Sequence, residues 1–195
     1  MIRIGVIGDI GSGKSFIAKL FKKPVFNADE EVKLIYRNNR VCFNKLKKKI
    51  PQFIKSFPIR KNEIVEAISN DKRNLIKISS VVHPFVRKKM KIFLKKNRKE
   101  NMVILDVPLL IENKLNKKKD ILIFIKSNQS NILKRLKKRT NFNKKVLKSL
   151  KKNQSSVLEK KKLSNYVVDN NYSPNIMKKK INKLKNKILN ERSST

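Results

Sequence analysis

Cysteine and acidic residues are both scarce in this sequence of 195 residues, and each shortage excludes a class of protein. Cys42 is the single cysteine, so no disulfide can form within the chain, which fits a reducing compartment and predicts a cytoplasmic location. No apolar run approaches the roughly 20 residues that a transmembrane helix needs. The amino-terminal apolar run is too short for a signal peptide. We therefore expect no membrane association.

The shortage of acids leaves a large positive charge. Lysine and arginine number 51 against 14 Asp and Glu, which gives a formal net charge of +37. Such an excess is typical of nucleic-acid-binding proteins. Here, however, the lysines are spread along the chain among many asparagines and isoleucines, and basic clusters interleaved with aromatic residues are absent. This spread favours compositional drift over a specific nucleic-acid partner, although a positive field would also speed the association of anionic substrates.

Glycine is scarce too, and three of the four glycines lie between residues 8 and 13. A β-branched apolar run, residues 2–7, precedes this stretch, and an apolar pattern with helical spacing, residues 16–21, follows it. The order strand, Gly-x-x-x-x-Gly-Lys-Ser, helix is that of a phosphate-binding loop. We expect Lys14 to reach the β and γ phosphates of a nucleoside triphosphate and the Ser15 hydroxyl to ligate magnesium.

Further apolar runs and helical spacing between them predict an α/β fold. The expected fold is that of P-loop NTPases, a five-stranded parallel sheet flanked by helices. The other four strands are expected at residues 24–26, 102–106, 121–125 and 166–168. We expect a single P-loop domain over 1–195, with a core at about 1–30, 98–138 and 164–195, a helical acceptor-binding insertion at about 31–97 and a lid at about 139–163.

Acidic residues lie at the ends of two of the predicted strands. Asp106 is the last residue of the strand at 102–106, where an acid can hold the magnesium shell beside a phosphate loop. Asp29 follows the second strand and is a candidate base or magnesium-linked carboxylate. Its alternative role is to cap a helix that begins near Glu30. Glu112 is a further candidate for a substrate contact.

Two other features have both a structural and a functional interpretation. His83 is the only histidine, and taken alone it is better explained as a packed helix residue than as a catalytic group.

Arg135 and Arg139 lie one helical turn apart at the start of a basic segment. In a phosphoryl transferase this segment would form a lid that lays arginines on the phosphates, whereas the alternative is a solvated basic hairpin.

These motifs together resemble the dephospho-coenzyme A kinase family over nearly the whole chain. The resemblance implies transfer of the γ-phosphoryl group of ATP to the ribose 3′-hydroxyl of dephospho-coenzyme A, with magnesium. The residues that carry it are Gly8 to Ser15, Asn27-Ala28-Asp29, His83-Pro84 with Arg87, Val107-Pro108-Leu109-Leu110 with Glu112, Arg135 with Arg139, Gln154 followed by Lys160, and Val168-Asp169-Asn170.

The resemblance also implies a role for individual residues. Lys14, Asp29 and Arg139 would be catalytic, with Asp29 orienting or deprotonating the 3′-hydroxyl and Arg139 contacting phosphate from the lid. Asn170 would lie beside the adenine. The residues that would wrap the phosphates are Gly11, Ser12, Gly13, Lys14, Ser15 and Phe16, and those on the acceptor side would be Asp29, His83, Arg87, Pro108, Leu109 and Glu112.

The sequence departs from the family pattern at four positions. Asn27 stands where the first of two aspartates is usual, so Asp29 would carry more of the catalytic role. Asp9 replaces a frequent glycine in the loop, at a cost that depends on its φ. Lys61 and Val157 stand where arginine is common or occurs. We interpret the chain as a divergent but active enzyme.

Two other functions remain open from the sequence alone. One is a kinase of similar build that acts on another small-molecule or nucleotide acceptor. The other is a basic nucleic-acid-binding NTPase. For the kinase we expect ATP and dephospho-coenzyme A as partners, no specific nucleic acid and no membrane, in a monomer or weak homo-oligomer.

Overall fold

The computed structural model describes residues 1–137, 147–148, 150–151, 154–170 and 173–193. The chain divides into two compact units, and each is described by itself. The first unit is built from the described residues of 1–27, 97–142 and 154–195, and the second from those of 28–96 and 143–153. None of the helices in these described ranges is both long and apolar enough to cross a membrane.

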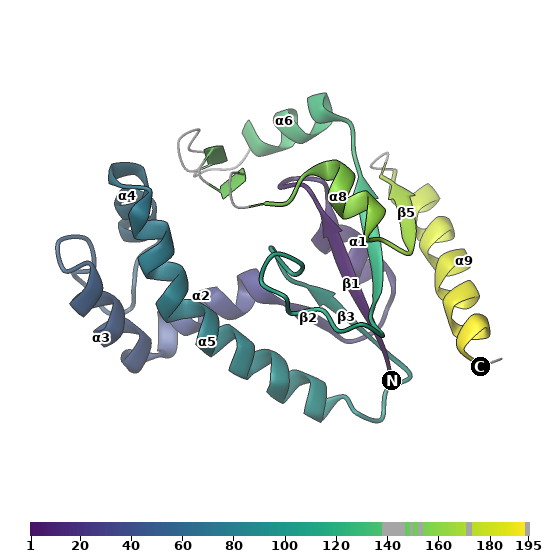
Figure 1. Ribbon diagram of the computed structural model, residues 1–195, viewed down its shortest axis with the longest axis horizontal. Helices are drawn as coiled ribbons and strands as arrows, with labels where there is room; N and C mark the ends of the chain where they lie inside the picture. Colours follow the sequence, from purple (N-terminus) through teal and green to yellow (C-terminus); the bar gives the residue numbers. More distant parts are fainter. Residues whose placement is uncertain (138–146, 149, 152–153, 171–172, 194–195) are drawn as a thin grey trace. The chain divides into compact units, whose positions relative to one another are not determined.

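A five-stranded parallel sheet forms the centre of the first unit (Figure 1). Its strands lie in the order β2-β3-β1-β4-β5, which confirms the predicted parallel α/β sheet. The central strands are continuous apolar runs because helices can cover both faces of a parallel sheet. The strands are β1 (Ile2–Gly8), β2 (Val25–Asn27), β3 (Met102–Asp106), β4 (Ile121–Lys126) and β5 (Tyr166–Asp169).

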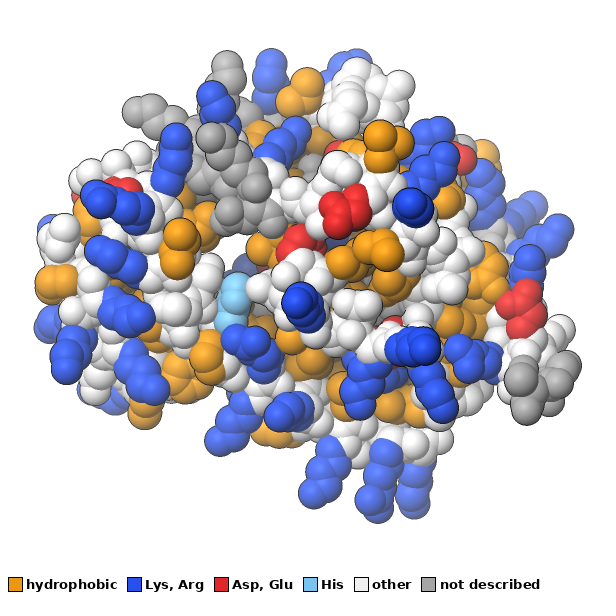
Figure 2. Space-filling model, in the orientation of Figure 1, with side chains coloured by type: hydrophobic (Ala, Val, Ile, Leu, Met, Phe, Trp, Pro, Cys, Tyr) orange, Lys and Arg blue, Asp and Glu red, His pale blue; other side chains and the backbone are white. Residues whose placement is uncertain are grey.

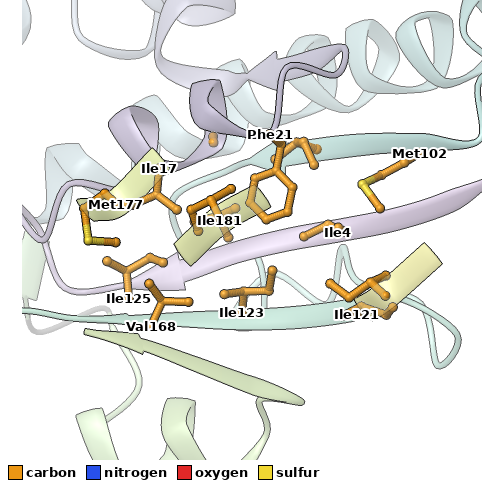
Figure 3. Packing of buried hydrophobic residues seen from close by; sticks show 14 residues of the cluster. Ile4, Ile17, Phe21, Met102, Ile121, Ile123, Ile125, Val168, Met177 and Ile181 are labelled. Atoms are coloured by element: carbon orange, nitrogen blue, oxygen red, sulfur yellow. The ribbon is translucent and has the colours of Figure 1, made fainter. Parts of the chain in front are cut away.

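In the described part of the first unit, four helices accompany the sheet. They are α1 (Lys14–Leu20), α6 (Gln129–Lys137), α8 (Val157–Lys162) and α9 (Pro174–Ser193). Apolar side chains of α1 and α9 pack with those of four strands into one buried cluster (Figure 3). Phe21 and Ile4 are fully buried there, and burying a side chain of this size contributes about 1.5 to 3 kcal/mol. This core holds the sheet and α1 in a fixed relation, which fixes the loop between them.

The carboxyl ends of the strands meet along one edge of the sheet. In the register of the parallel pairs, Gly8 lies opposite Ile125 and Asn27 lies opposite Asp106. In open parallel sheets, ligands bind at this edge. The phosphate loop after β1 and the acid that ends β3 are therefore placed at the edge where a site is expected.

The second unit is helical. It contains α2 (Ala28–Asn38), α3 (Arg40–Lys49), α4 (Lys61–Asn70) and the long α5 (Arg73–Lys96). A helical segment was predicted here, but not the break between α2 and α3. At that break the Asn39 side chain accepts a hydrogen bond from the Cys42 backbone N–H at 2.8 Å, which caps α3. Cys42 is fully buried, and burial raises the pKa of its thiol to about 11.

The start of α2 corrects one prediction. The helix begins at Ala28 rather than near Glu30, because Asn27 ends β2 and the chain turns at once into the helix. Asp29 therefore lies in the first turn of α2 and does not occupy the cap position. An acid in the first turn still interacts favourably with the helix dipole.

Basic side chains are spread widely over the face of the molecule drawn in Figure 2. Figure 2 shows lysines and arginines scattered across one face, with few acidic side chains among them. In that view they do not gather into a single patch. The distribution agrees with the spread of lysines along the sequence.

Candidate active site

The phosphate loop connects β1 to α1 through residues 9–13. Gly13 occupies the N-cap of α1 with φ 90° and ψ 22°, a left-handed conformation that glycine adopts without the strain that a Cβ atom causes. No side chain caps this end of α1. The first-turn N–H groups of a helix have no partner within the helix, so this end is suited to bind an anion.

Close packing at the end of β1 shapes the interior of the loop. A Cβ atom on Gly8 would lie 2.7 Å from the Ile125 carbonyl oxygen and 2.9 Å from Ser12 Oγ. Ser12 Oγ itself is buried and has no hydrogen-bond partner among the residues that the structure describes. Native structures rarely leave a buried polar atom unpaired. The loop thus has the backbone shape and the spare polar capacity that suit the phosphates of ATP.

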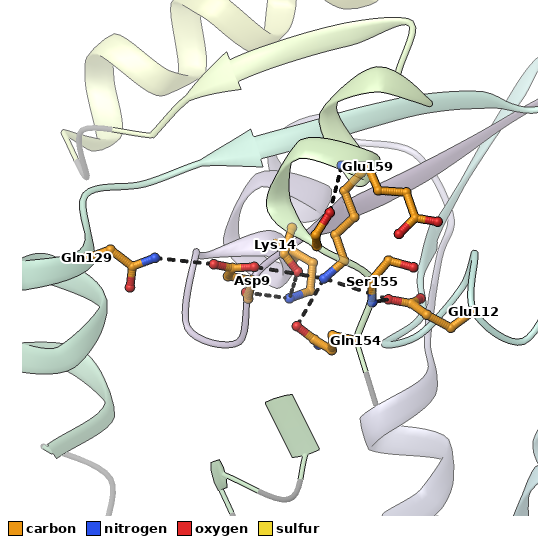
Figure 4. A network of polar contacts seen from close by, with 10 residues as sticks. Asp9, Lys14, Glu112, Gln129, Gln154, Ser155 and Glu159 are labelled. Carbon is orange, nitrogen blue, oxygen red and sulfur yellow. Dashed lines mark hydrogen bonds and ion pairs between the residues drawn. The ribbon is translucent and has the colours of Figure 1, made fainter. Parts of the chain in front are cut away.

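Lys14 and Ser15 begin α1 at the mouth of this loop. Lys14 Nζ donates to the carbonyl oxygens of Gly8, at 3.1 Å, and Asp9, at 2.8 Å, so its ammonium group lies against the loop (Figure 4). Ser15 is exposed in the first turn of α1. Both predicted residues are therefore placed by the helix at its amino-terminal end, where phosphate charge would be neutralised.

The ends of β4 and β5 are tied to the loop through the carbonyl oxygen of Ser12. This oxygen accepts hydrogen bonds from Ser127 Oγ and from Asn170 Nδ2, both at 2.8 Å. Asn170 is buried, and its backbone N–H donates to the Lys126 carbonyl at 2.8 Å. Asn170 also lines a groove beside the loop, together with Lys126, Ser127, Asn128, Asn131 and Asp169. The position predicted to lie beside the adenine thus borders a groove next to the phosphate loop.

Asp106 and Asn27 meet at the neighbouring strand ends. Asn27 Nδ2 donates to Asp106 Oδ2 at 2.7 Å, and Asp106 is only 3% exposed. Asn27, which stands where the family usually has an aspartate, therefore donates a hydrogen bond to Asp106, the predicted magnesium-linked acid. A hydrogen bond to a charged acceptor is shorter and stronger than one between neutral groups.

The segment after β3 lies beside the phosphate loop. Pro108, Leu109 and Glu112 line a small pocket with Lys14 and Gly8. Leu109 has φ 59°, an uncommon conformation for a non-glycine residue that often marks a functional site. Glu112 Oε1 accepts a hydrogen bond from the Ser155 N–H at 2.8 Å. The structure thus brings three predicted acceptor-side residues together with the predicted phosphate-binding lysine.

The other predicted acceptor-side residues belong to the second unit. Asp29 is exposed in α2, and His83 and Arg87 lie one turn apart on α5, half-buried and exposed respectively. Burial, and then the charge of Arg87, hold the pKa of His83 below its usual 6.5. Arg139, the predicted lid arginine, lies outside the described residues. Arg135 is exposed near the end of α6.

Sequence reasoning gave no role to Lys160 or to the acid at Asp9, yet both belong to this site. Lys160 lines the same small pocket as Lys14, and Asp9 lies within the phosphate loop. Asp9 is not among the described non-glycine residues with positive φ, so the acid causes no backbone strain there. The sequence alone does not show which of its 51 basic residues is buried. Only the family pattern, in which Gln154 is followed by Lys160, singled out Lys160.

The donor set suits magnesium better than a softer metal. Ser15 and Asp106 offer a hydroxyl and a carboxylate, and magnesium prefers oxygen ligands. Within the described ranges no cluster of three or more His, Cys, Asp or Glu residues could hold a metal by itself. At phosphate loops, water and the nucleotide phosphates generally supply most magnesium ligands.

Comparison with known proteins identifies the family. The family model described as dephospho-CoA kinase matches residues 2–175. The chain belongs to the dephospho-CoA kinase family. A curated dephospho-CoA kinase from Wolbachia sp. subsp. Brugia malayi is 30% identical over 175 residues, which cover 87% of this chain and 89% of the relative. Membership makes the chain a kinase, a transferase that uses ATP as phosphoryl donor.

Solved structures agree on the fold of these kinases. A Thermus thermophilus protein has a TM-score of 0.75 at 24% identity, with 97% of each chain covered. A dephospho-CoA kinase from Campylobacter jejuni has a TM-score of 0.64 at 19% identity, with 95% of this chain and 96% of that chain covered. At these identities the likeness concerns the fold, and it confirms the predicted P-loop kinase architecture.

Proposed function

We propose that this kinase transfers the γ-phosphoryl group of ATP to the ribose 3′-hydroxyl of dephospho-coenzyme A, giving coenzyme A and ADP. The observation that carries the proposal is the shared pocket of Lys14 and residues 107–112. The phosphate loop therefore lies beside the segment 107–112, which contains Pro108, Leu109 and Glu112. A phosphoryl donor and a hydroxyl acceptor must be held together in this way for transfer.

The residues of the loop bind and orient the donor. The open end of α1 and the ammonium group of Lys14 compensate the negative charge on the β and γ phosphates. The groove that Asn170 borders is the proposed adenine site. Ser15 and Asp106 would hold magnesium, directly or through water, and magnesium neutralises charge that develops on the phosphates. Catalysis of phosphoryl transfer consists mainly of such positioning and charge compensation.

The proposed roles of Asp29, His83 and Arg87 follow from their places in the family pattern. We propose that Asp29 orients or deprotonates the 3′-hydroxyl and that His83 and Arg87 bind the acceptor. Asp29 is suited to this role because its side chain is exposed at the amino-terminal end of α2. Arg139 is proposed to contact the transferring phosphate from the lid, as its place in the family pattern implies. The division into a core, an insertion and a lid stays a prediction.

A panel of acceptors tests the proposal. ADP formation is followed in a coupled assay with ATP, magnesium and one acceptor at a time: dephospho-coenzyme A, its 3′-deoxy analogue, shikimate, and nucleoside monophosphates. We expect ADP above the hydrolysis background only with dephospho-coenzyme A. Because the 3′-deoxy analogue lacks only the proposed nucleophile, it is the matched control. Equal ADP formation with another acceptor would reassign the substrate.

The same assay separates the kinase from a nucleic-acid-dependent NTPase. A nucleic-acid-binding enzyme would hydrolyse ATP faster with DNA or RNA, and its binding would fall steeply as salt is raised. We expect neither effect, because basic side chains are scattered in Figure 2 rather than gathered in one patch. We further propose a cytoplasmic location and a monomer or weak homo-oligomer, which light scattering at several protein concentrations would check.

A further inference from the structure

Lys160 is a buried lysine beside the phosphate loop. Its side chain, on α8, is only 4% exposed. Nζ donates to Gln154 Oε1 at 3.0 Å and forms ion pairs with Glu112 Oε1 at 3.7 Å and Asp9 Oδ1 at 3.8 Å. A buried ammonium group is unfavourable unless opposite charge and hydrogen bonds compensate it. Here oxygen atoms from three separate segments converge on one ammonium group.

Asp9 brings a negative charge into a loop that has to hold polyphosphate. Its Oδ1 faces Lys160, and its Oδ2 accepts from Gln129 Nε2 at 3.4 Å (Figure 4). An uncompensated carboxylate at this place would repel the phosphates of a nucleotide. Lys14 contacts the backbone carbonyl groups of Gly8 and Asp9. The negative charge of the Asp9 side chain therefore needs a positive partner close by. Lys160 is that partner.

The segment that carries Lys160 is itself held at the site. Glu112 accepts a hydrogen bond from the Ser155 N–H, and Ser156 Oγ caps α8 by accepting from the Glu159 N–H at 3.1 Å. The Ser164 hydroxyl donates to the Lys160 carbonyl at 2.7 Å. The first bond ties the start of this segment to Glu112, and the other two lie within the segment, at the two ends of α8. Lys160 is therefore carried by a segment that is itself bonded to Glu112.

We propose that Lys160 is a positioning residue of the nucleotide site, which compensates the charge of Asp9 and joins the phosphate loop to the loop that follows β3. This inference rests on the proposed nucleotide site and gives a function to two residues that the phosphate-loop pattern leaves unexplained. In this role Lys160 acts through Asp9 and Glu112. Its effect on ATP affinity should therefore depend on whether the residue at position 9 is charged.

A double-mutant cycle tests this dependence. ATP affinity is measured by titration calorimetry with magnesium and without acceptor, for wild type, Lys160→Met, Asp9→Asn and the double variant. We expect Lys160→Met to weaken ATP binding about tenfold, a size typical of coupled residues in one ion-pair network. Asp9→Asn alone should change the affinity by about threefold or less. The double variant should recover to within about threefold of Asp9→Asn.

Lys161, which follows Lys160 on α8, provides the matched control. Lys161→Met removes the same charge from an exposed neighbour on α8 and should leave ATP affinity within about twofold. Additive effects of Lys160→Met and Asp9→Asn would overturn the proposal, as would equal effects of Lys160→Met and Lys161→Met. If a thermal melt shows that Lys160→Met does not fold, Lys160→Gln, which keeps a donor for Gln154, replaces it in the cycle.

The cycle can fail independently of the proposed reaction. The titration needs no acceptor. The coupling between Lys160 and Asp9 in ATP affinity can therefore be measured even in a chain that binds ATP but does not phosphorylate dephospho-coenzyme A. Additive affinities in a chain that does phosphorylate dephospho-coenzyme A would contradict only the role of Lys160.

Discussion

Asn27 and Asp106 are joined side chain to side chain at the ends of two paired strands. Their Cα atoms are register partners of β2 and β3, and Asn27 Nδ2 lies 2.7 Å from Asp106 Oδ2. At this distance an amide gives a favourable hydrogen bond, whereas a second carboxylate would give contact between like charges. The departure from the family pattern at position 27 is therefore matched to the buried acid across the strands.

Asn27→Asp should consequently destabilise the chain rather than restore a missing function. It replaces a donor with a negative charge beside a buried carboxylate, and we expect a loss of about 1 to 3 kcal/mol in the free energy of unfolding. Urea unfolding at pH 7 measures it. Asn101→Asp adds the same charge at an exposed position and is the control. Equal stability of the two variants would show that the contact with Asp106 is unimportant.

Lys14→Ala should remove most of the activity. Compensation of phosphate charge is the main catalytic contribution expected of this lysine, so turnover should fall by roughly two to four orders of magnitude. The check is kcat for ADP release together with a thermal melt. Lys19→Ala, an exposed lysine in the last turn of α1, should behave like wild type. Turnover within about tenfold of wild type in a folded Lys14→Ala protein would remove the phosphate-loop assignment.

Asp29→Asn distinguishes a catalytic carboxylate from a structural one. If Asp29 takes the 3′-hydroxyl proton, kcat should fall by about 10² to 10⁴ with nucleotide affinity little changed. The loss of its interaction with the helix dipole alone would cost only about 0.3 to 1 kcal/mol of stability. Glu31→Gln removes a charge from the same first turn and is the matched control. A kcat for Asp29→Asn within about threefold of the Glu31→Gln value would refute the catalytic role.

His83 gives a direct readout of its surroundings because it is the only histidine. Burial and the nearby Arg87 charge lower its pKa, so its NMR titration midpoint should lie below 6.5. Arg87→Gln should raise the midpoint only part of the way, since burial is the larger cause. Lys95→Gln, an exposed lysine further along α5, should not move it. A midpoint above 6.5 would contradict the described environment.

The same shift fixes the direction of a pH effect on stability. The unfolded chain binds a proton at His83 near pH 6.5, above the pH at which the folded chain does so. Between these two pKa values the unfolded state holds more protons, so the contribution of His83 to folding stability decreases as pH falls through that window and is constant below it. Comparing wild type with His83→Gln at pH 7.5 and pH 5 measures this contribution.

Local patterns in the sequence predicted much of the fold. The five strands are apolar runs, and the turn from β1 into α1 needs glycine, so both can be predicted from neighbouring residues. The break at Asn39 was missed because the helical pattern continues on both sides of it. A polar side chain that accepts from a backbone N–H three residues later is an N-cap only where a new helix begins.

The polar partnerships of the site could not be predicted in this way. Asn27 and Asp106 are separated by 79 residues and meet only through the strand register. Asp9 and Lys160 come together only because α8 packs beside the end of β1. Such pairings depend on tertiary structure, so the sequence could identify Asn27 and Asp9 as departures from the family pattern but not their partners.

Transfer of one phosphoryl group to the 3′-hydroxyl of dephospho-coenzyme A is tested most directly by the ³¹P NMR spectrum of the reaction product. With ATP, magnesium and dephospho-coenzyme A, we predict one new phosphomonoester resonance at the 3′ position, in equal amount to the ADP formed. No such resonance should appear with the 3′-deoxy acceptor. ADP that accumulates without 3′-phosphorylated product, or phosphate attached at the 2′ position, would contradict the account.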